Sequence, residues 1–377
     1  MGLKSAQALH HFIAESPWSL REVRKRRLSQ TLAALKGNAI TVVIDETGDR
    51  KKGKRTDYVS RQYLGSLGKI DSGIVSVNAY GIYKKITFPL LFKVFKPKGT
   101  LKEGDKYQKK IELASEILKE LIEFGFKIDL VLADSLYGEA SSFIRTLDEL
   151  KLPWIVAIRS NHGVWLPARQ RVRANKWHQF QRIFSNQTSQ TRYIREIIFG
   201  KRSSRSYWEI TIDPETLPEN STVFVMTNLQ GNIKKSLGNC YGLRTWIEYA
   251  FRQDKQELGW TDYRFTDFQN IEKWWEIIFS VYLMISLNSP AFLSLHQSYT
   301  TETEIQHSTV DFSRHQQWNP HRGWKNVLNN LRLIIQPTLA LWLLSPWLDL
   351  FPNSSLLLGF HELIHAMNQF QPFFPDG

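Results

Sequence analysis

Hydrophobic and polar residues along the chain follow two different periods, and these periods predict its elements. Residues 39–44 form an apolar, β-branched run, which is typical of a strand buried on both faces. Residues 74–83 and 86–92 are further β-rich runs, and the two lysines between them predict a hairpin. The pattern therefore predicts three strands in the first hundred residues.

Helical and strand patterns alternate after this hairpin. Residues 111–124 place apolar side chains on one helical face, and Gly125 follows them, as is common at the end of a helix. Residues 128–133 and 154–158 are apolar runs that predict strands, and residues 140–150 between them predict a helix. This order predicts an α/β fold in which helices flank a mixed sheet.

The second half of the chain begins with more strands and ends with helices. Three further β-like runs lie at 193–199, 207–212 and 222–226. A single long helix is predicted from Tyr241 to Leu258, because its apolar residues recur at helical spacing and Gly259 follows. The residues after 270 are rich in Trp and Leu at helical spacing, which predicts helices that pack against the sheet.

Composition excludes several classes of protein. Hydrophobic residues make up 42% and charged residues 23% of the 377 positions, so the chain is globular and not disordered. The lone Cys240 excludes a disulfide framework and suggests a reducing compartment. The apolar stretch 277–287 is shorter than the roughly 20 residues that span a bilayer, and Pro337 interrupts the run 333–344. These observations predict a soluble, cytoplasmic protein without a membrane partner.

Charge points to a polyanionic partner. Lys and Arg number 49 against 36 Asp and Glu, which gives a net charge of +13 and a pI near 9.6. Ten basic and two acidic residues fall between positions 160 and 210, where aromatic residues are interleaved with them. Such a mixture suits phosphate contact and base stacking. Those basic and aromatic residues are Arg169, Arg171, Arg173, Lys176, Arg182, Arg192, Arg195, Lys201, Arg202, Arg205, Trp165, Trp177, Phe180, Tyr193, Tyr207 and Trp208.

Two of the predicted strands are each followed by an aspartate. Asp45 follows the run 39–44, and Asp134 follows the run 128–133. Because sites in α/β sheets form at the carboxyl ends of strands, the two side chains converge if their strands are neighbours. Paired carboxylates repel each other, and a divalent cation relieves that repulsion. For either aspartate alone, a helix N-cap or loop position is the favoured interpretation, and the pair in a basic chain favours a metal site.

A third carboxylate is suggested by the predicted helix at 241–258. With 100° per residue, Tyr241, Arg244, Glu248 and Lys255 fall within about 60° of one another, on one stripe of the helix. The alternative is an exposed helix face on which Arg244 and Glu248 form an ordinary i,i+4 pair.

The spacing of these four residues resembles the Tyr-Arg-Glu-Lys signature of DDE-type insertion-sequence transposases. Residues 43–48 and 133–138 resemble the blocks around the first and second aspartates of that family, and residues 61–65 also resemble the family. The three blocks occur in the family's order. The resemblance implies an RNase H-like mixed sheet flanked by helices, a β-rich insertion before the catalytic Glu helix and a helical C-terminal region.

The resemblance also implies a reaction and its site. Asp45, Asp134 and Glu248 would be the catalytic residues and the ligands of two Mg²⁺ or Mn²⁺ ions about 3.5–4 Å apart, with Asp45 bridging them. Tyr241, Arg244 and Lys255 would be the DNA-binding residues. The implied reaction is cut-and-paste cleavage and strand transfer through a hairpin intermediate. The implied partner is double-stranded DNA, both transposon ends and target, bound by a homodimer in the nucleoid of a prokaryotic cytoplasm.

This resemblance and the element pattern together divide the chain into five regions. They are a short basic helical N-terminal region at 1–38, which is shorter than a complete end-binding domain of that family; the first part of the RNase H-like core at 39–158; the basic β-rich insertion at 159–235; the completion of the core with the Glu helix at 236–300; and the helical C-terminal region at 301–377.

Two alternative functions stand beside this one. The first is a catalytically inactive, transposase-derived protein that binds DNA. The second is a zinc metallopeptidase, because residues 361–365 read His-Glu-Leu-Ile-His, the pattern in which two histidines one helical turn apart bind zinc. That chemistry needs a third ligand, and none follows within the twelve residues after His365. A C-terminal amphipathic helix explains the same five residues without a metal.

Overall fold

The computed structural model describes residues 6–53, 55–65, 67–84, 86–163, 171–184, 188–198, 204–297, 314–319 and 323–368. Trp165, Arg169, Lys201 and Arg202 of the basic segment lie outside these ranges. The chain divides into two compact units, which are described separately. The larger comprises Leu35–Lys255 and Thr261–Phe268, and the smaller Met1–Ala34, Gln256–Trp260 and Gln269–Gly377.

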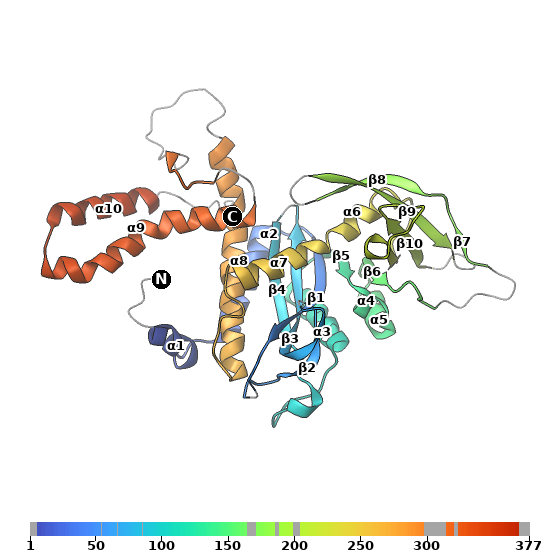
Figure 1. Ribbon diagram of the computed structural model, residues 1–377, viewed down its shortest axis with the longest axis horizontal. Helices are drawn as coiled ribbons and strands as arrows, with labels where there is room; N and C mark the ends of the chain where they lie inside the picture. The colour runs from blue at the N-terminus through green and yellow to red at the C-terminus, as the bar shows by residue number, and fades with distance from the viewer. Residues whose placement is uncertain are drawn as a thin grey trace. The chain divides into compact units, whose positions relative to one another are not determined.

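The larger unit is built on one mixed sheet (Figure 1). Its strands are β1 (Ile40–Arg50), β2 (Ser60–Leu64), β3 (Lys69–Tyr83), β4 (Ile86–Val94), β5 (Ile128–Ala133), β6 (Trp154–Ile158), β7 (Arg173–Ala174), β8 (His178–Ile183), β9 (Ser189–Ile198), β10 (Ser206–Thr211) and β11 (Val223–Thr227). Its helices are α3 (Lys110–Phe124), α4 (Ser135–Gly138), α5 (Ser141–Glu149), α6 (Leu237–Gly242) and α7 (Thr245–Gln256), with 3-10 turns η1 (Lys98–Thr100) and η2 (Glu219–Ser221).

Strand order confirms the predicted RNase H-like arrangement. β3 pairs antiparallel with β1 on one side and with β4 on the other, and β5 and β6 continue the sheet parallel to β1. The predicted hairpin is confirmed, and Lys84 takes the left-handed backbone conformation in its turn, with a φ of 54°. The strands predicted at 128–133 and 154–158 have the bounds of β5 and β6.

The basic insertion extends this sheet. β11 pairs antiparallel with β6, β10 with β11, and β9 with β10, so the strands after the core add to its edge. β7 and β8 both pair with β9. Within the described residues, the insertion therefore shares a continuous hydrogen-bonded sheet with the core.

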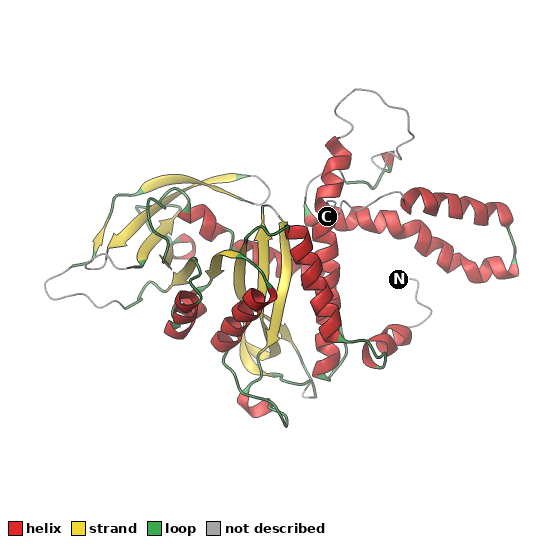
Figure 2. Cartoon of the chain, turned by 180° about the vertical axis from the view of Figure 1, so that it is seen from behind, coloured by secondary structure: helices red, strands yellow, loops and turns green. Residues whose placement is uncertain are grey.

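Helices cover both faces of the core strands. α7 crosses the face seen in Figure 1, and α3 lies over the face seen in Figure 2. Tyr80 of β3 joins α7 through a hydrogen bond to Asp254 and an edge-to-face contact with Phe251 at 5.7 Å between ring centroids. α3 ends at Gly125, as predicted, with that residue in the left-handed conformation at a φ of 106°. The core between these layers is fully buried, for example at Ile44.

Two predictions of element boundaries are wrong, and one short helix was not predicted. β1 continues beyond the predicted run 39–44 to Arg50, because residues 45–50 keep pairing with β3. The predicted helix 241–258 is two helices, α6 and α7, with a turn at Leu243 and Arg244. The short helix α4 directly after Asp134 has no counterpart among the predicted elements.

The smaller unit is helical, as predicted for both ends of the chain. Its helices are α1 (Ala6–Ala14), α2 (Leu20–Leu35), α8 (Phe268–Gln297), α9 (Trp324–Leu350) and α10 (Ser354–Asn368). Glu276 of α8 is fully buried and pairs with Arg27 at 2.6 Å and with Arg24 at 2.8 Å, both from α2. Trp260 and Trp275 stack with their ring centroids 4.4 Å apart. Basic residues of the N-terminal region thus serve the packing of α2 on α8.

α9 overturns one sequence expectation. Its helix continues through both Pro337 and Pro346, whereas Pro337 was expected to interrupt the apolar run. By length and composition, α9 is the one helix within the described ranges that is long and apolar enough to cross a membrane. None of its most apolar stretch is buried inside the structure.

Candidate functional site

The sheet brings the two predicted aspartates together. The last parallel pair between β1 and β5 joins Ile44 to Ala133, so Asp45 and Asp134 are the next residues on adjacent strands. Asp134 caps α4, because its Oδ1 accepts a hydrogen bond from the backbone N–H of Leu136 at 3.0 Å. Oδ1 of Asp45 accepts one from the N–H of Glu46 at 2.8 Å. Asp134 is thus both an N-cap and a member of the pair.

Arg244 links the third carboxylate to the first. Its Nη1 donates to Oδ2 of Asp45 at 3.0 Å, and its Nη2 donates to Oε1 of Glu248 at 2.6 Å. The side chains of Asp45 and Arg244 are 13% and 21% exposed, whereas that of Glu248 is 52% exposed. The Arg244 guanidinium therefore lies between a largely buried carboxylate and a solvent-facing one.

Burial disfavours the ionised forms of the two aspartates. Burial raises the pKa of Asp45 to about 7, the Arg244 charge opposes the rise, and the nearby Asp134 and Glu248 charges add to it. Burial also raises the pKa of Asp134, against the opposing effect of Arg244. The pKa of Arg244 is raised because its acidic neighbours outweigh the cost of burying its charge. The site favours a cation.

The donor chemistry fits a divalent ion, although the side chains are not arranged around one. Three carboxylates supply the oxygen ligands that Mg²⁺ and Mn²⁺ prefer, and desolvated like charges gain from a cation between them. Across the residues that the structure describes, no group of three or more His, Cys, Asp or Glu side chains is positioned to hold a metal ion. Arg244 takes the place between Asp45 and Glu248.

The turn between α6 and α7 separates the four signature residues. Tyr241 lies on α6, Arg244 in the turn, and Glu248 and Lys255 on α7, so the predicted stripe on one helix is wrong. The carbonyl of Gly242 accepts hydrogen bonds from Thr245 Oγ1 at 3.0 Å and from Arg182 Nη2 at 3.3 Å. In a continuous helix this carbonyl would accept a hydrogen bond from the N–H of Trp246. That N–H instead donates to the carbonyl of Leu243.

Tyr241 and Lys255 have different surroundings. Burial raises the pKa of Tyr241, and the neighbouring Arg244 opposes part of that rise. Lys255 donates from Nζ to the carbonyl of Gly48 at 2.8 Å, and burial lowers its pKa while Asp49 and Asp254 oppose the change. The structure thus brings Tyr241 to the carboxylates and ties Lys255 to β1 further along the strand.

Sequence reasoning missed the contribution of the insertion to this site. Arg182 of β8 reaches the turn at Gly242, and its charge acts on Glu248 and Tyr241. The sequence offered only a general excess of Arg and Lys in the insertion. Arg182 lies two positions after Phe180, and this strand spacing was a usable indication that both side chains share one face.

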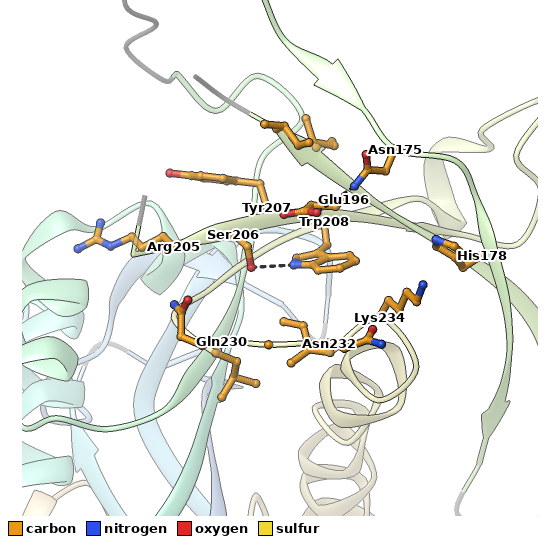
Figure 3. A pocket seen from close by; sticks show the side chains of 15 residues that line it. Asn175, His178, Glu196, Arg205, Ser206, Tyr207, Trp208, Gln230, Asn232 and Lys234 are labelled. Carbon is orange, nitrogen blue, oxygen red and sulfur yellow. Dashed lines mark hydrogen bonds between the residues drawn. The ribbon is translucent and has the colours of Figure 1, made fainter. Parts of the chain in front are cut away.

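A separate cavity of about 440 Å³ lies within the insertion. Figure 3 shows the Trp208 indole above the loop at Asn232, with its Nε1 donating to Ser206 Oγ at 2.8 Å. None of the three carboxylates lines this cavity, so we assign it no part in their chemistry. Its polar and aromatic lining includes Asn175, His178, Glu196, Arg205, Tyr207, Gln230 and Lys234.

The zinc-peptidase pattern lies on α10. His361 and His365 are both exposed on this helix, which agrees with the C-terminal helix expected without a metal. No third ligand joins them in the part of the chain that the structure describes. The peptidase alternative therefore gains no support from the geometry.

Sequence comparisons with known proteins agree on one family. Residues 3–182 match DDE superfamily endonucleases, and residues 104–284 match the transposase DDE domain. The chain is 53% identical over 273 residues to a protein of Microchaete diplosiphon described as the probable transposase for insertion sequence element IS701, with 72% of each chain covered. A solved Drosophila P element transposase strand transfer complex shares 14% identity at a TM-score of 0.22, over 40% of this chain and 30% of that one.

Proposed function

The chain belongs to the DDE transposase family, and on that premise we propose that it cuts transposon ends from DNA and joins them to a target. One observation carries the proposal: the register of β1 and β5 places Asp45 beside Asp134, and Arg244 joins Asp45 to Glu248. The site is therefore assembled from three segments that are far apart in the sequence.

Asp45, Asp134 and Glu248 would hold the divalent ions that proteins of this family generally use. When bound, Mg²⁺ or Mn²⁺ activates the attacking water or 3′-hydroxyl and stabilises the leaving oxygen at phosphorus. The chain itself contributes the burial that withholds water from Asp45 and Asp134. The backbone N–H groups of Glu46 and Leu136 fix the orientation of these two carboxylates.

DNA would be held beside these carboxylates. Arg244 and Tyr241 lie next to them and are proposed to contact the backbone of the transposon end, and Lys255 is proposed as a third contact further along α7. The proposed route is cut-and-paste through a hairpin on the transposon end. The proposed assembly is a homodimer on DNA in the nucleoid of a prokaryotic cytoplasm, because each reaction joins two ends.

The test is the substitution Asp45→Asn, which keeps the side-chain shape and removes one carboxylate charge. The matched control is Asp129→Asn, an exposed carboxylate on β5. With a duplex carrying the terminal repeats of its own element and Mn²⁺, we expect the wild type and Asp129→Asn to cut at the ends. Asp45→Asn should bind the duplex and leave it intact. Cleavage by Asp45→Asn at the wild-type rate would remove Asp45 from the site.

The same assay distinguishes the non-catalytic alternative. Specific binding of the terminal repeats by the wild type, without nicking in either Mg²⁺ or Mn²⁺, would assign the chain as a transposase-derived DNA-binding protein. The bridge from Arg244 to Asp45 and Glu248 is the feature of this structure most compatible with that outcome, because one guanidinium already pairs with two of the three carboxylates.

A further inference from the structure

The β8–β9 hairpin presents two arginines on a single face. In the antiparallel register, Phe180 lies opposite Arg192 and Arg182 lies opposite Gln190. Since alternate residues of a strand point to the same side, these four side chains share one face of the hairpin. Phe180 is buried on that face, which shows that the face packs against another part of the unit.

Its packing partner is α6, through two glycines one turn apart. A Cβ added to Gly238 would lie 2.2 Å from the Phe180 ring, and one added to Gly242 would lie 3.2 Å from Nε of Arg182. Asn239 fixes the same contact, because its Nδ2 donates to the carbonyl of Gln181 and its Oδ1 accepts from the N–H of Ile183, both at 3.0 Å. The hairpin is thereby held against the helix that precedes Arg244 and Glu248.

Arg182 and Arg192 have neutral hydrogen-bond partners. Arg182 donates to Gly242 and Thr245, and Arg192 donates twice to Gln190 Oε1, at 3.2 and 3.0 Å. Among the described residues, neither forms an ion pair with a carboxylate. Arg195, two residues along β9 from Arg192, pairs instead with Glu209 at 2.6 Å. The two arginines therefore keep donors for an anion that does not belong to this chain.

Their charges also lie close enough to repel each other. Burial and, to a smaller extent, the Arg182 charge together lower the pKa of Arg192 to about 10. Burial lowers the pKa of Arg182, with Arg244 adding to the effect and Glu248 opposing it. Both groups remain protonated at neutral pH, so an anion placed between them would gain two charge-assisted contacts and relieve their repulsion.

We propose that Arg182 and Arg192 form a phosphate clamp that holds the DNA backbone beside the Asp45, Asp134 and Glu248 carboxylates. This inference rests on the proposed function and adds two residues from the insertion to its DNA contacts. Guanidinium groups bind phosphate oxygens in a bidentate manner, and they would offset the repulsion between the acidic site and the polyanion. The two glycines of α6 set the distance between the clamp and the Glu248 helix.

The experiment measures binding of the terminal-repeat duplex over a range of salt concentrations. The variants are Arg182→Gln, Arg192→Gln and their double, and the matched control is Arg145→Gln, an exposed arginine of α5 in the same unit. Each clamp variant should lower affinity roughly tenfold and reduce the slope of log K against log salt by about 1, and the double variant by about 2. Arg145→Gln should leave the slope close to that of the wild type.

A charge-conserving variant separates phosphate binding from packing. Arg182→Lys keeps the charge and loses the guanidinium fork, so it should retain the salt slope while losing part of the affinity. Arg192→Gln is decisive if Arg182→Gln fails to fold, because, among the described residues, the hydrogen bonds of the Arg192 side chain go only to Gln190 on its own strand. A wild-type slope in Arg192→Gln would overturn the clamp.

The wild-type protein separates this inference from the proposed function. If the wild type neither binds nor cuts the duplex, the proposed function fails. If the wild type cuts the duplex and both clamp variants behave like Arg145→Gln, the clamp alone is wrong.

Discussion

Arg244 donates a hydrogen bond from Nη1 to Oδ2 of Asp45 at 3.0 Å, although the two residues are 199 positions apart in the chain. The same guanidinium holds Glu248 through its second terminal nitrogen. One arginine therefore links β1 to α7 beside the three carboxylates. A divalent ion bound by Asp45 and Glu248 would have to replace these two contacts or share the carboxylates with them.

The first prediction concerns this competition. Replacing Arg244 by Gln removes the positive charge between the carboxylates, so the affinity for Mn²⁺ without DNA should rise about tenfold, since charge-assisted hydrogen bonds are worth about 1.5–3 kcal/mol each. Isothermal titration calorimetry with MnCl₂ measures this affinity. The control is Arg252→Gln, which removes an exposed arginine from the same helix. Equal Mn²⁺ affinity in both variants would show that Arg244 does not compete with the ion.

The second prediction concerns a buried carboxyl group under α7. Burial raises the pKa of Asp254 to about 7, while the hydrogen bond from Tyr80 and the Lys255 charge oppose the rise. The folded state therefore binds a proton that the unfolded state has released between about pH 4 and 7. Because the folded state holds more protons in this window, the free energy of unfolding falls as pH rises through it and levels off above 7.

Asp254→Asn removes this dependence. Chemical denaturation measures the free energy of unfolding at pH 5 and at pH 8. From pH 5 to pH 8 this free energy should fall by a few kcal/mol more in the wild type than in Asp254→Asn, as expected for a pKa raised well above its usual value. Asp262→Asn, an exposed carboxylate in the same unit, is the control and should follow the wild type. A constant difference in stability between wild type and Asp254→Asn at the two pH values would contradict the raised pKa.

The third prediction tests how closely the hairpin packs on α6. Gly238→Ala places a methyl group 2.2 Å from the Phe180 ring, so the hairpin must move or the unit must lose stability by roughly 1–3 kcal/mol. Gly231→Ala, at a left-handed turn with nothing near its Cβ position, would carry backbone strain and is unsuitable as a control. Gly65→Ala has open space and ordinary backbone, so it should unfold at the wild-type temperature. Equal melting temperatures for the wild type, Gly238→Ala and Gly65→Ala would mean that the hairpin packs loosely on α6.

Much of the core could be predicted from the sequence because buried parallel strands leave an unbroken apolar pattern. The runs 39–44 and 128–133 identified β1 and β5, and the residue after each run identified Asp45 and Asp134. The sequence left open whether these two strands are neighbours, and the register of β1 and β5 shows that they are. The length of β1 was underestimated, because residues 45–50 are polar or small and are held in the strand by β3.

The turn between α6 and α7 was not predicted, and one of its contacts comes from outside the local sequence. Residues 241–258 have the spacing of one helix, and nothing within them shows that Arg182 takes the carbonyl of Gly242. Arg244 and Glu248 remain neighbours even so, since the pair is joined directly by a hydrogen bond. A tertiary contact from a residue 60 positions away accompanies the break in the helical pattern, while the contact between Arg244 and Glu248 persists.

The last prediction concerns the smaller unit. Glu276 is fully buried between Arg24 and Arg27, and Arg27 is itself 2% exposed. Arg27→Met keeps much of the side-chain volume but leaves Glu276 with one partner, so the unit should lose about 3–5 kcal/mol, as when one member of a buried ion pair is removed. Arg26→Met, which removes a neighbouring exposed arginine, is the matched control and should change stability by less than about 0.5 kcal/mol.

Urea denaturation measures the free energy of unfolding of the two variants. A double variant shows whether any loss comes from the unpaired charge or from packing. Arg27→Met combined with Glu276→Gln removes the uncompensated charge as well as its partner, so it should recover part of the loss. Recovery would attribute the cost to a buried carboxylate without its partner, and a further loss of stability would attribute it to packing between α2 and α8. Because α2 belongs to the basic N-terminal region, the first outcome would also show that Arg27 serves the fold and is not a free DNA contact.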